Sequence, residues 1–108
     1  MLYSVEYSWP MITVVHTPEF SSWLDSIKDA VTRARLIKRL RKVSLGNLGD
    51  VKPVGGGVSE MREFFGTGWR MYYTMRGSML IVMLGGGDKS TQSTDIAKAI
   101  ELAATLED

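Results

Sequence analysis

The stretch that decides the fold is residues 58–84, VSEMREFFGTGWRMYYTMRGSMLIVML. It contains three runs rich in apolar, β-branched and aromatic residues, which are typical of strands. The runs cover residues 58–65, 69–76 and 79–84, and the segments between them are Gly66-Thr67-Gly68 and Gly77-Ser78. Short connections that contain glycine join adjacent antiparallel strands. The stretch therefore predicts a three-stranded antiparallel meander.

The flanking segments predict one further strand and three helices. These are a strand over 11–16, helices over 18–28, 30–44 and 94–106, and a glycine-rich loop over 45–57. Thr17-Pro18-Glu19 indicates a helix start, because a hydroxyl caps the helix, proline fits its first turn and an acid suits its positive end. Apolar residues recur at helical spacing in all three helical segments.

These elements predict an α+β protein with a small antiparallel sheet, two N-terminal helices packed on one face and a C-terminal helix. We expect the helices to cover one face of the sheet and to leave the other open. Residues 11–108 are interpreted as a single domain. Residues 1–10 are interpreted as a leader, with Met11 as the alternative start, because the composition changes at Pro10-Met11. The alternative is that Tyr3, Val5 and Tyr7 form an extra strand.

Composition narrows the chemistry that the chain can perform. The 108 residues include no cysteine and one histidine, His16, which lies far in sequence from the other candidate groups. Disulfides, thiolate metal sites and cysteine nucleophiles are therefore excluded, and we expect neither a metal nor a small-molecule cofactor. No apolar run approaches the roughly 20 residues of a membrane span, and no secretory pattern is visible. We expect a cytoplasmic protein with no membrane partner.

Charge is unevenly distributed along the chain. The whole chain carries a net charge of +1, whereas residues 28–62 contain nine basic and three acidic residues, a net charge of +6. A basic segment of this kind suits a face that binds a polyanion. The alternative is an ordinary solvated helix surface.

Strand alternation divides residues 69–76 between two faces. One face is apolar and suits a helix-covered core: Trp69, Met71, Tyr73 and Met75. The other face is polar: Arg70, Tyr72, Thr74 and Arg76. A regular hairpin register also places Glu60 and Arg62 of the preceding strand on the polar face. We therefore expect Glu60, Arg62, Arg70 and Tyr72 to lie together on the open face.

An acid, two guanidinium groups and a phenol suit phosphodiester chemistry. Arginine binds phosphate oxygens with two parallel hydrogen bonds and stabilises the charge that builds on them. Tyrosine contacts a base or a phosphate, and a carboxylate takes the proton of a ribose 2′-OH. No metal is needed when that 2′-OH is the nucleophile. The alternative is a solvated face on which Glu60 pairs with an arginine across the strands.

Two other features are weaker candidates. Gly85-Gly86-Gly87 followed by Lys89 suits an anion-binding loop before a helix, although the P-loop spacing is absent. The alternative is a tight connection from strand to helix. Four methionines at strand spacing are interpreted as core residues: Met71, Met75, Met79 and Met83.

Four segments together resemble the addiction module killer protein family, in the HigB-like branch of the RelE/ParE toxin superfamily. They are TPEFSSWL (17–24), LGNLGDVKPVGGGVSEMR (45–62), GTGWRMYY (66–73) and LGGGDKSTQSTDIAKA (84–99). The resemblance covers residues 11–104. It implies a RelE-type fold and a helix-turn-helix (HigA-like) antitoxin as partner.

The resemblance leaves two activities open. RelE-like members cut mRNA in the ribosomal A site by 2′-OH attack, whereas ParE-like members inhibit DNA gyrase. A convergent cluster of catalytic groups favours the nuclease, a ribosome-dependent mRNA endonuclease with ribosome and mRNA as partners. The sequence also leaves open a third interpretation: the chain has lost its toxicity, or its open face only binds a partner.

The resemblance also assigns roles to individual residues. Glu60, Arg62, Arg70, Tyr72 and Lys89 occupy the catalytic positions, with Glu60 or Lys89 as the base. Many RelE-like nucleases carry a histidine or tyrosine near the C-terminus, and residues 93–108 contain neither. Under the nuclease hypothesis, the basic residues expected to bind RNA are Arg35, Lys38, Arg39, Arg41, Lys42 and Lys52.

Overall fold

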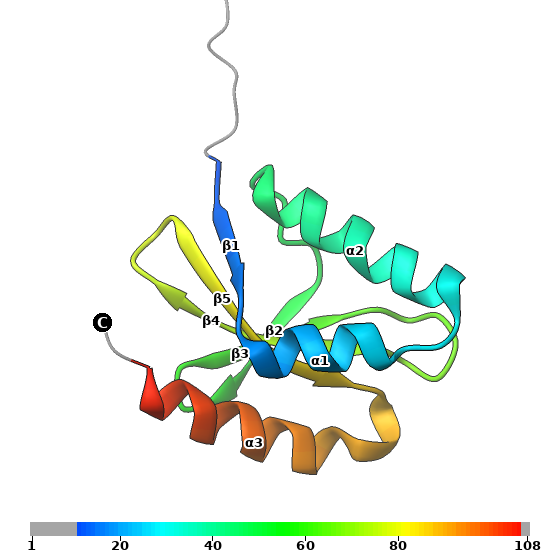
Figure 1. The fold of residues 1–108 in the computed structure, drawn as a ribbon. Coiled ribbons are helices and arrows are strands. Elements are labelled where there is room, and N and C mark those ends of the chain that lie inside the picture. Colours follow the sequence, from blue (N-terminus) through cyan, green and yellow to red (C-terminus); the bar gives the residue numbers. More distant parts are fainter. Residues whose placement is uncertain (1–10, 107–108) are drawn as a thin grey trace, which may run out of the picture.

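A computed structural model describes residues 11–106 of the chain, so the predicted leader at 1–10 lies outside the described residues. A five-stranded sheet, ordered β1-β5-β4-β3-β2, is sandwiched between helices (Figure 1). The strands are β1 (Thr13–His16), β2 (Val51–Gly55), β3 (Val58–Arg62), β4 (Arg70–Arg76) and β5 (Leu80–Gly87). The helices are α1 (Pro18–Ser26), α2 (Ala30–Ser44) and α3 (Gln92–Thr105), with a short 3₁₀ turn at Lys89–Thr91 before α3.

The predicted α+β fold and the meander β3-β4-β5 are confirmed. β3 pairs antiparallel with β4, and β4 pairs antiparallel with β5. β1 pairs parallel with β5, on the side of β5 that faces away from β4. The helix starts are also confirmed. Thr17 caps α1 by accepting a hydrogen bond from Phe20 N at 3.1 Å, and its hydroxyl donates to Met83 O at 2.8 Å. One residue thus starts the helix and ties it to the sheet.

The expectation of one open sheet face is wrong, because the helices lie on both faces. α1 and α2 pack on one face, where the core contains Phe20, Leu36 and Met71. α3 packs on the other face through Ala99 and Ala103 (Figure 1). Two alanines on one side of α3 allow it to approach the sheet closely. The polar residues of β4 therefore lie under a helix.

The segment 45–57, predicted as a loop, contains the edge strand β2. It pairs antiparallel with β3 and turns through Gly56 and Gly57, whose φ angles of 60° and 77° favour glycine. Pro53 and the lack of a regular apolar–polar alternation hide this strand in the sequence. Proline is tolerated in a strand mainly at an edge, which is where β2 lies.

The glycine run predicted as a loop is instead the end of β5. Gly85, Gly86 and Gly87 pair with Tyr72, Met71 and Arg70 of β4. A β-carbon on Gly86 would lie 2.5 Å from the indole of Trp23 in α1. One on Gly87 would collide with the Asp95 carboxylate of α3. The two helices therefore reach the last residues of β5 from opposite faces only because side chains are missing there.

The methionine prediction is correct for two residues and wrong for two. Met71 and Met83 are fully buried, whereas Met75 and Met79 are 39% and 44% exposed. The latter two lie on either side of the turn between β4 and β5. None of the helices within residues 11–106 has the length and apolar character needed to traverse a bilayer.

Candidate functional site

The strand pair β3 and β4 brings four predicted catalytic residues together. Glu60 lies opposite Tyr72 in the register, and Arg62 lies opposite Arg70. All four belong to the face of the sheet that α3 covers. The predicted regular register is confirmed, while the predicted exposure is not.

The four residues differ in how much of each is exposed to solvent. Glu60, Arg70 and Tyr72 are 2%, 6% and 0% exposed, whereas the Arg62 side chain is 30% exposed. Gln92, in the first turn of α3, donates from Nε2 to Glu60 Oε1 at 3.0 Å. Arg70 Nε lies 4.0 Å from Glu60 Oε2. The alternative pairing of Glu60 with an arginine is therefore present, as a long ion pair in a buried cluster.

Tyr72 has an unusual environment within this cluster. Burial, and then the nearby Glu60 carboxylate, raise the pKa of the Tyr72 hydroxyl far above its ordinary value. The hydroxyl has no hydrogen-bond partner among the described residues. A buried hydroxyl without a partner destabilises the fold. It also remains a proton donor at neutral pH, so Tyr72 cannot act as a base there.

The two arginines extend from this buried cluster toward an exposed phenyl ring. Phe64 is 71% exposed, and the guanidinium carbons of Arg62 and Arg70 lie 5.5 and 5.6 Å from its ring centroid. Arg62 also pairs with Asp50 at 3.1 Å. Phe64 is not among the residues that the sequence predicts for this site. Its position two residues after Arg62, on the same side of an extended chain, was the signal that could have identified it.

Lys89 lies at the edge of the same region. Its backbone N–H donates to Thr67 O at 3.4 Å. A β-carbon on Gly68 would lie 3.5 Å from Lys89 Cβ and 3.6 Å from Arg70 Nη1, so Gly68 separates the two residues. The Lys89 side chain is exposed. The structure thus brings Lys89 close to the arginines from a distant part of the chain.

Of the six predicted RNA-binding residues, five are exposed and one is not. The exposed residues are Arg35, Lys38, Arg41, Lys42 and Lys52. Arg39 is 8% exposed, pairs with Glu63 and donates to the carbonyls of Leu48, Asp50 and Arg62. Assigning Arg39 to an RNA-binding surface was therefore wrong, because its guanidinium is engaged inside the protein.

Gly49 explains how the loop reaches Arg39. It has a φ of 71°, and a β-carbon there would lie 3.0 Å from the Arg39 guanidinium. The glycine allows the loop backbone to turn closely around that group. The LGNLGD motif therefore serves to build this buried contact.

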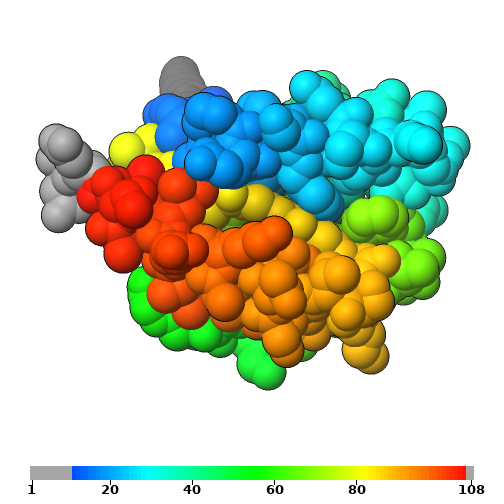
Figure 2. All heavy atoms as spheres, turned by 60° about the horizontal axis from the view of Figure 1, so that its bottom comes forward, coloured from blue at the N-terminus to red at the C-terminus, as the bar shows by residue number. Residues whose placement is uncertain are grey.

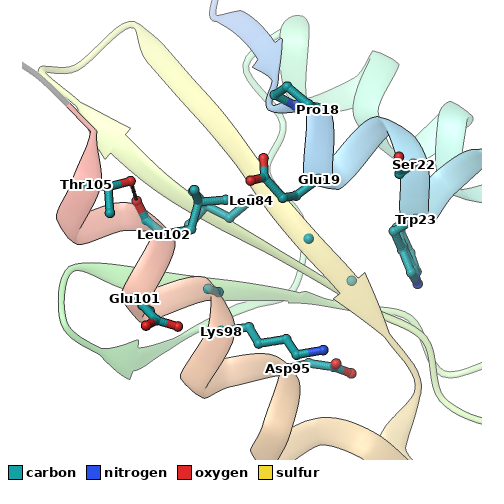
Figure 3. A pocket seen from close by; sticks show the side chains of 13 residues that line it. Pro18, Glu19, Ser22, Trp23, Leu84, Asp95, Lys98, Glu101, Leu102 and Thr105 are labelled. Carbon is teal, nitrogen blue, oxygen red and sulfur yellow. Dashed lines mark hydrogen bonds between the residues drawn. The ribbon is translucent and has the colours of Figure 1, made fainter.

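A groove of about 840 Å³ lies between α1 and α3. Figure 2 shows it between the blue α1 and the orange α3, with the yellow β5 at its floor. Figure 3 shows acidic side chains in the lining, Glu19 from α1 and Asp95 and Glu101 from α3, with Lys98 on α3 and the indole of Trp23 on α1. β1 ends at His16, so beyond Met83 this edge of β5 has no neighbouring strand within residues 11–106. These charged side chains give the groove a net negative charge, and through Asp95, which lies against Gly87, it adjoins the strand position opposite Arg70.

Residues 22–107 match the family described as Phage derived protein Gp49-like (DUF891), and the chain belongs to this family. An uncharacterized protein of Haemophilus influenzae is 39% identical over 95 residues, which cover 88% of this chain and 96% of that protein.

Two solved structures of other proteins have a similar fold. The structure resembles the E. coli toxin RelE, a mutant in the free state, with a TM-score of 0.68 at 14% identity over 85% of this chain and 97% of that one. It also resembles a chain of the toxin–antitoxin complex RelBE2 of Mycobacterium tuberculosis, with a TM-score of 0.61 at 20% identity over 73% and 99% of the two chains. The fold is that of RelE toxins, so the predicted RelE-type fold is confirmed. The HigB-like branch stays a prediction.

Proposed function

We propose that this protein is the toxin of a toxin–antitoxin pair and that it cleaves mRNA on the ribosome by attack of a ribose 2′-OH. The observation that carries the proposal is the β3-β4 register, which gathers Glu60, Arg62, Arg70 and Tyr72. The RelE-like fold supports it. An inhibitor that acts by binding alone needs no such convergence of an acid, two guanidinium groups and a phenol.

Each residue has a defined role in this reaction. Arg62 and Arg70 bind the scissile phosphate and stabilise the charge of the transition state. Glu60 accepts the proton of the 2′-OH, which attacks phosphorus and forms a cyclic phosphate. Tyr72, held protonated, donates a hydrogen bond to the phosphate or a proton to the leaving 5′ oxygen. Lys89 is the alternative base and otherwise adds positive charge at the edge of the site.

The buried state of Glu60 sets a condition on this mechanism. Gln92 occupies Glu60 Oε1, and α3 covers Tyr72. RNA reaches both groups only when the first turn of α3 moves away from the sheet. Arg62 needs no such movement because it is already partly exposed. We therefore assign the initial phosphate contact to Arg62.

The basic surface of α2 supplies the contact to the ribosome. Arg35, Lys38, Arg41 and Lys42 lie exposed along α2, and Lys52 is exposed on β2. Lysines and arginines that neutralise RNA phosphates release counterions, which makes binding sensitive to salt. Binding to ribosomes is expected to weaken steeply as salt concentration rises.

The partner in the cell is an antitoxin of the HigA-like, helix-turn-helix type. The support is the similarity to a chain of the RelBE2 toxin–antitoxin complex and the harm that a free toxin would cause. Co-expression of the gene adjacent to this one is expected to restore growth and to yield a stable complex. Failure of every neighbouring gene product to bind or rescue would refute this assignment.

Inducing the protein and mapping mRNA 5′ ends, with and without ribosomes, tests the activity itself. Cleavage that depends on ribosomes, with a cyclic phosphate on the upstream product, is the expected result. Toxicity with double-strand DNA breaks and intact mRNA would replace this proposal with gyrase inhibition.

A further inference from the structure

The exposed ring of Phe64 has no structural role that accounts for it. Its 71% exposure exceeds that of every other large apolar side chain in residues 11–106. The other exposed apolar residues, such as Val31 and Met79, come from other parts of the fold, and none lies in the loop 63–69. A protein-docking surface is a contiguous apolar patch. Phe64 is instead a single ring among cations.

The cations beside the ring are an unfavourable pair without a ligand. Arg62 and Arg70 are register partners, and like charges directly opposite each other destabilise a strand pair. Asp50 and Glu60 compensate only in part, at 3.1 and 4.0 Å. The Nε–H groups of both arginines are buried without an acceptor among the described residues. An anion bound between the guanidinium groups would relieve this repulsion.

The ring and the two arginines define the ligand by their chemistry. Both guanidinium groups lie within about 6 Å of the ring centroid, the range of a cation–π contact. These contacts hold the arginines beside the ring, where an aromatic face and an anion site adjoin. Single-stranded RNA presents a matching pair, an unstacked base beside a phosphate. A base inside a duplex cannot reach an aromatic side chain in this way.

We propose that Phe64 is a stacking platform for one unpaired base of single-stranded RNA, whose adjacent phosphate binds to Arg62 and Arg70. This assignment rests on the proposed function in that RNA is the ligand. It adds a binding residue outside the predicted catalytic set. It also places a base next to the phosphate that Arg62, the partly exposed arginine, contacts first.

A fluorescent base tests the platform directly. The probe is a short single-stranded RNA with 2′-O-methyl groups, which cannot be cleaved, carrying one 2-aminopurine. The full chain is titrated with it at low ionic strength, where phosphate contacts are strongest. Stacking on Phe64 is expected to quench the fluorescence. Phe64→Leu is expected to weaken RNA binding about tenfold and to remove the quenching. Phe64→Trp is expected to keep the affinity for RNA and the quenching of the unmodified protein.

Two controls separate stacking from other effects. Met79→Leu changes an exposed apolar residue at the far end of β4 and β5 and is expected to bind like the unmodified protein. An abasic strand should bind the unmodified protein and Phe64→Leu equally, because it has no base to stack. Circular dichroism melting checks that all variants are folded.

The outcomes distinguish this inference from the proposed function. Quenching that depends on an aromatic residue at position 64, in a protein that cleaves no mRNA, keeps the platform and refutes the nuclease. Cleavage and RNA binding unchanged in Phe64→Leu overturn the platform and keep the nuclease. Absence of RNA binding by the unmodified protein overturns the platform. So does a Phe64→Leu variant that binds RNA normally but no longer binds the antitoxin, because the ring would then be a protein contact.

Discussion

The two sides of β4 differ in how completely their side chains are satisfied. Toward α1 and α2, Met71 and Tyr73 lie in a continuous apolar core. Toward α3, Arg70 donates from Nη1 to Trp69 O at 3.1 Å, but its Nε and the Tyr72 hydroxyl have no hydrogen-bond partner among the described residues. Buried polar groups that are partly satisfied destabilise a fold. One side of the strand thus stabilises the protein, and the other keeps reactive groups at a cost in stability.

The largest effect is expected on the apolar side. Met71→Ala leaves a cavity beneath α1 and α2, because the side chain is fully buried. The free energy of unfolding should fall by about 2–5 kcal/mol, measured by urea denaturation. Met75→Ala, on the same side but 39% exposed, is the matched control with a much smaller loss. If both variants lost the same free energy of unfolding, Met71 would not be more deeply packed than Met75, contrary to the structure.

Arg62→Ala should separate stability from activity. Its side chain is 30% exposed, so the free energy of unfolding should change by only about 0.5 kcal/mol. Loss of a charge-stabilising contact at the transition state should slow mRNA cleavage by about 10²–10³-fold. Primer extension on induced cells measures the cleavage. A fully active Arg62→Ala variant would remove this residue from the mechanism, and Arg70→Ala then tests the remaining guanidinium.

Glu60→Gln tests proton transfer with little change in shape. The variant should still bind RNA while cleaving it about 10²–10⁴-fold more slowly, the usual contribution of general acid–base catalysis. Lys89→Gln provides the comparison, because Lys89 is the alternative base. Normal cleavage by Glu60→Gln together with slow cleavage by Lys89→Gln would transfer the role of base to Lys89.

The smallest effect is expected from Tyr72→Phe, and it has the opposite sign. Removing a buried hydroxyl that lacks a partner should raise the free energy of unfolding by about 1 kcal/mol at neutral pH, while cleavage slows. A destabilised variant would mean that the hydroxyl has a partner in solution.

The same variant has a pH signature. Because the pKa of Tyr72 is raised in the folded state, the unfolded chain releases this proton first. Stability should therefore fall as pH rises above about 10, the ordinary tyrosine pKa. Tyr72→Phe should lessen this loss, as thermal melts across alkaline pH would show. Part of the loss of stability at alkaline pH should remain in this variant, because burial also raises the pKa of Tyr73.

Much of the fold could be predicted from local patterns. Thr17 and Pro18 mark the start of α1, and the bounds of α2 agree with the predicted 30–44. Alternation in β4 correctly separated Met71 from Tyr72. What failed depends on contacts between distant segments. Nothing local in Gly86 reveals that Trp23 occupies the space above it, and composition alone suggested a loop.

The candidate site could be predicted in position but not in accessibility. The alternation of side chains along the two strands predicts which residues share a face, so the sequence could predict that Glu60 lies beside Tyr72. The location of α3 was not, because its apolar stripe fits either face of a sheet. Arg39 looks like its neighbours on α2, and only the path of residues 48–50 buries it. Phe64 falls within the predicted strand 58–65, and nothing local in the sequence shows that its ring lies beside the guanidinium of Arg70.

The buried guanidinium of Arg39 has a consequence for the dynamics of the protein. It joins α2 to the carbonyls of Leu48 and Asp50 before β2 and of Arg62 at the end of β3. Segments tied through one side chain open together in a single cooperative unit rather than fraying separately. The amide protons of α2, β2 and β3 should therefore exchange with deuterium at similar rates. In Arg39→Met those rates should diverge, with β2 exchanging first and becoming the earliest site of proteolytic cleavage.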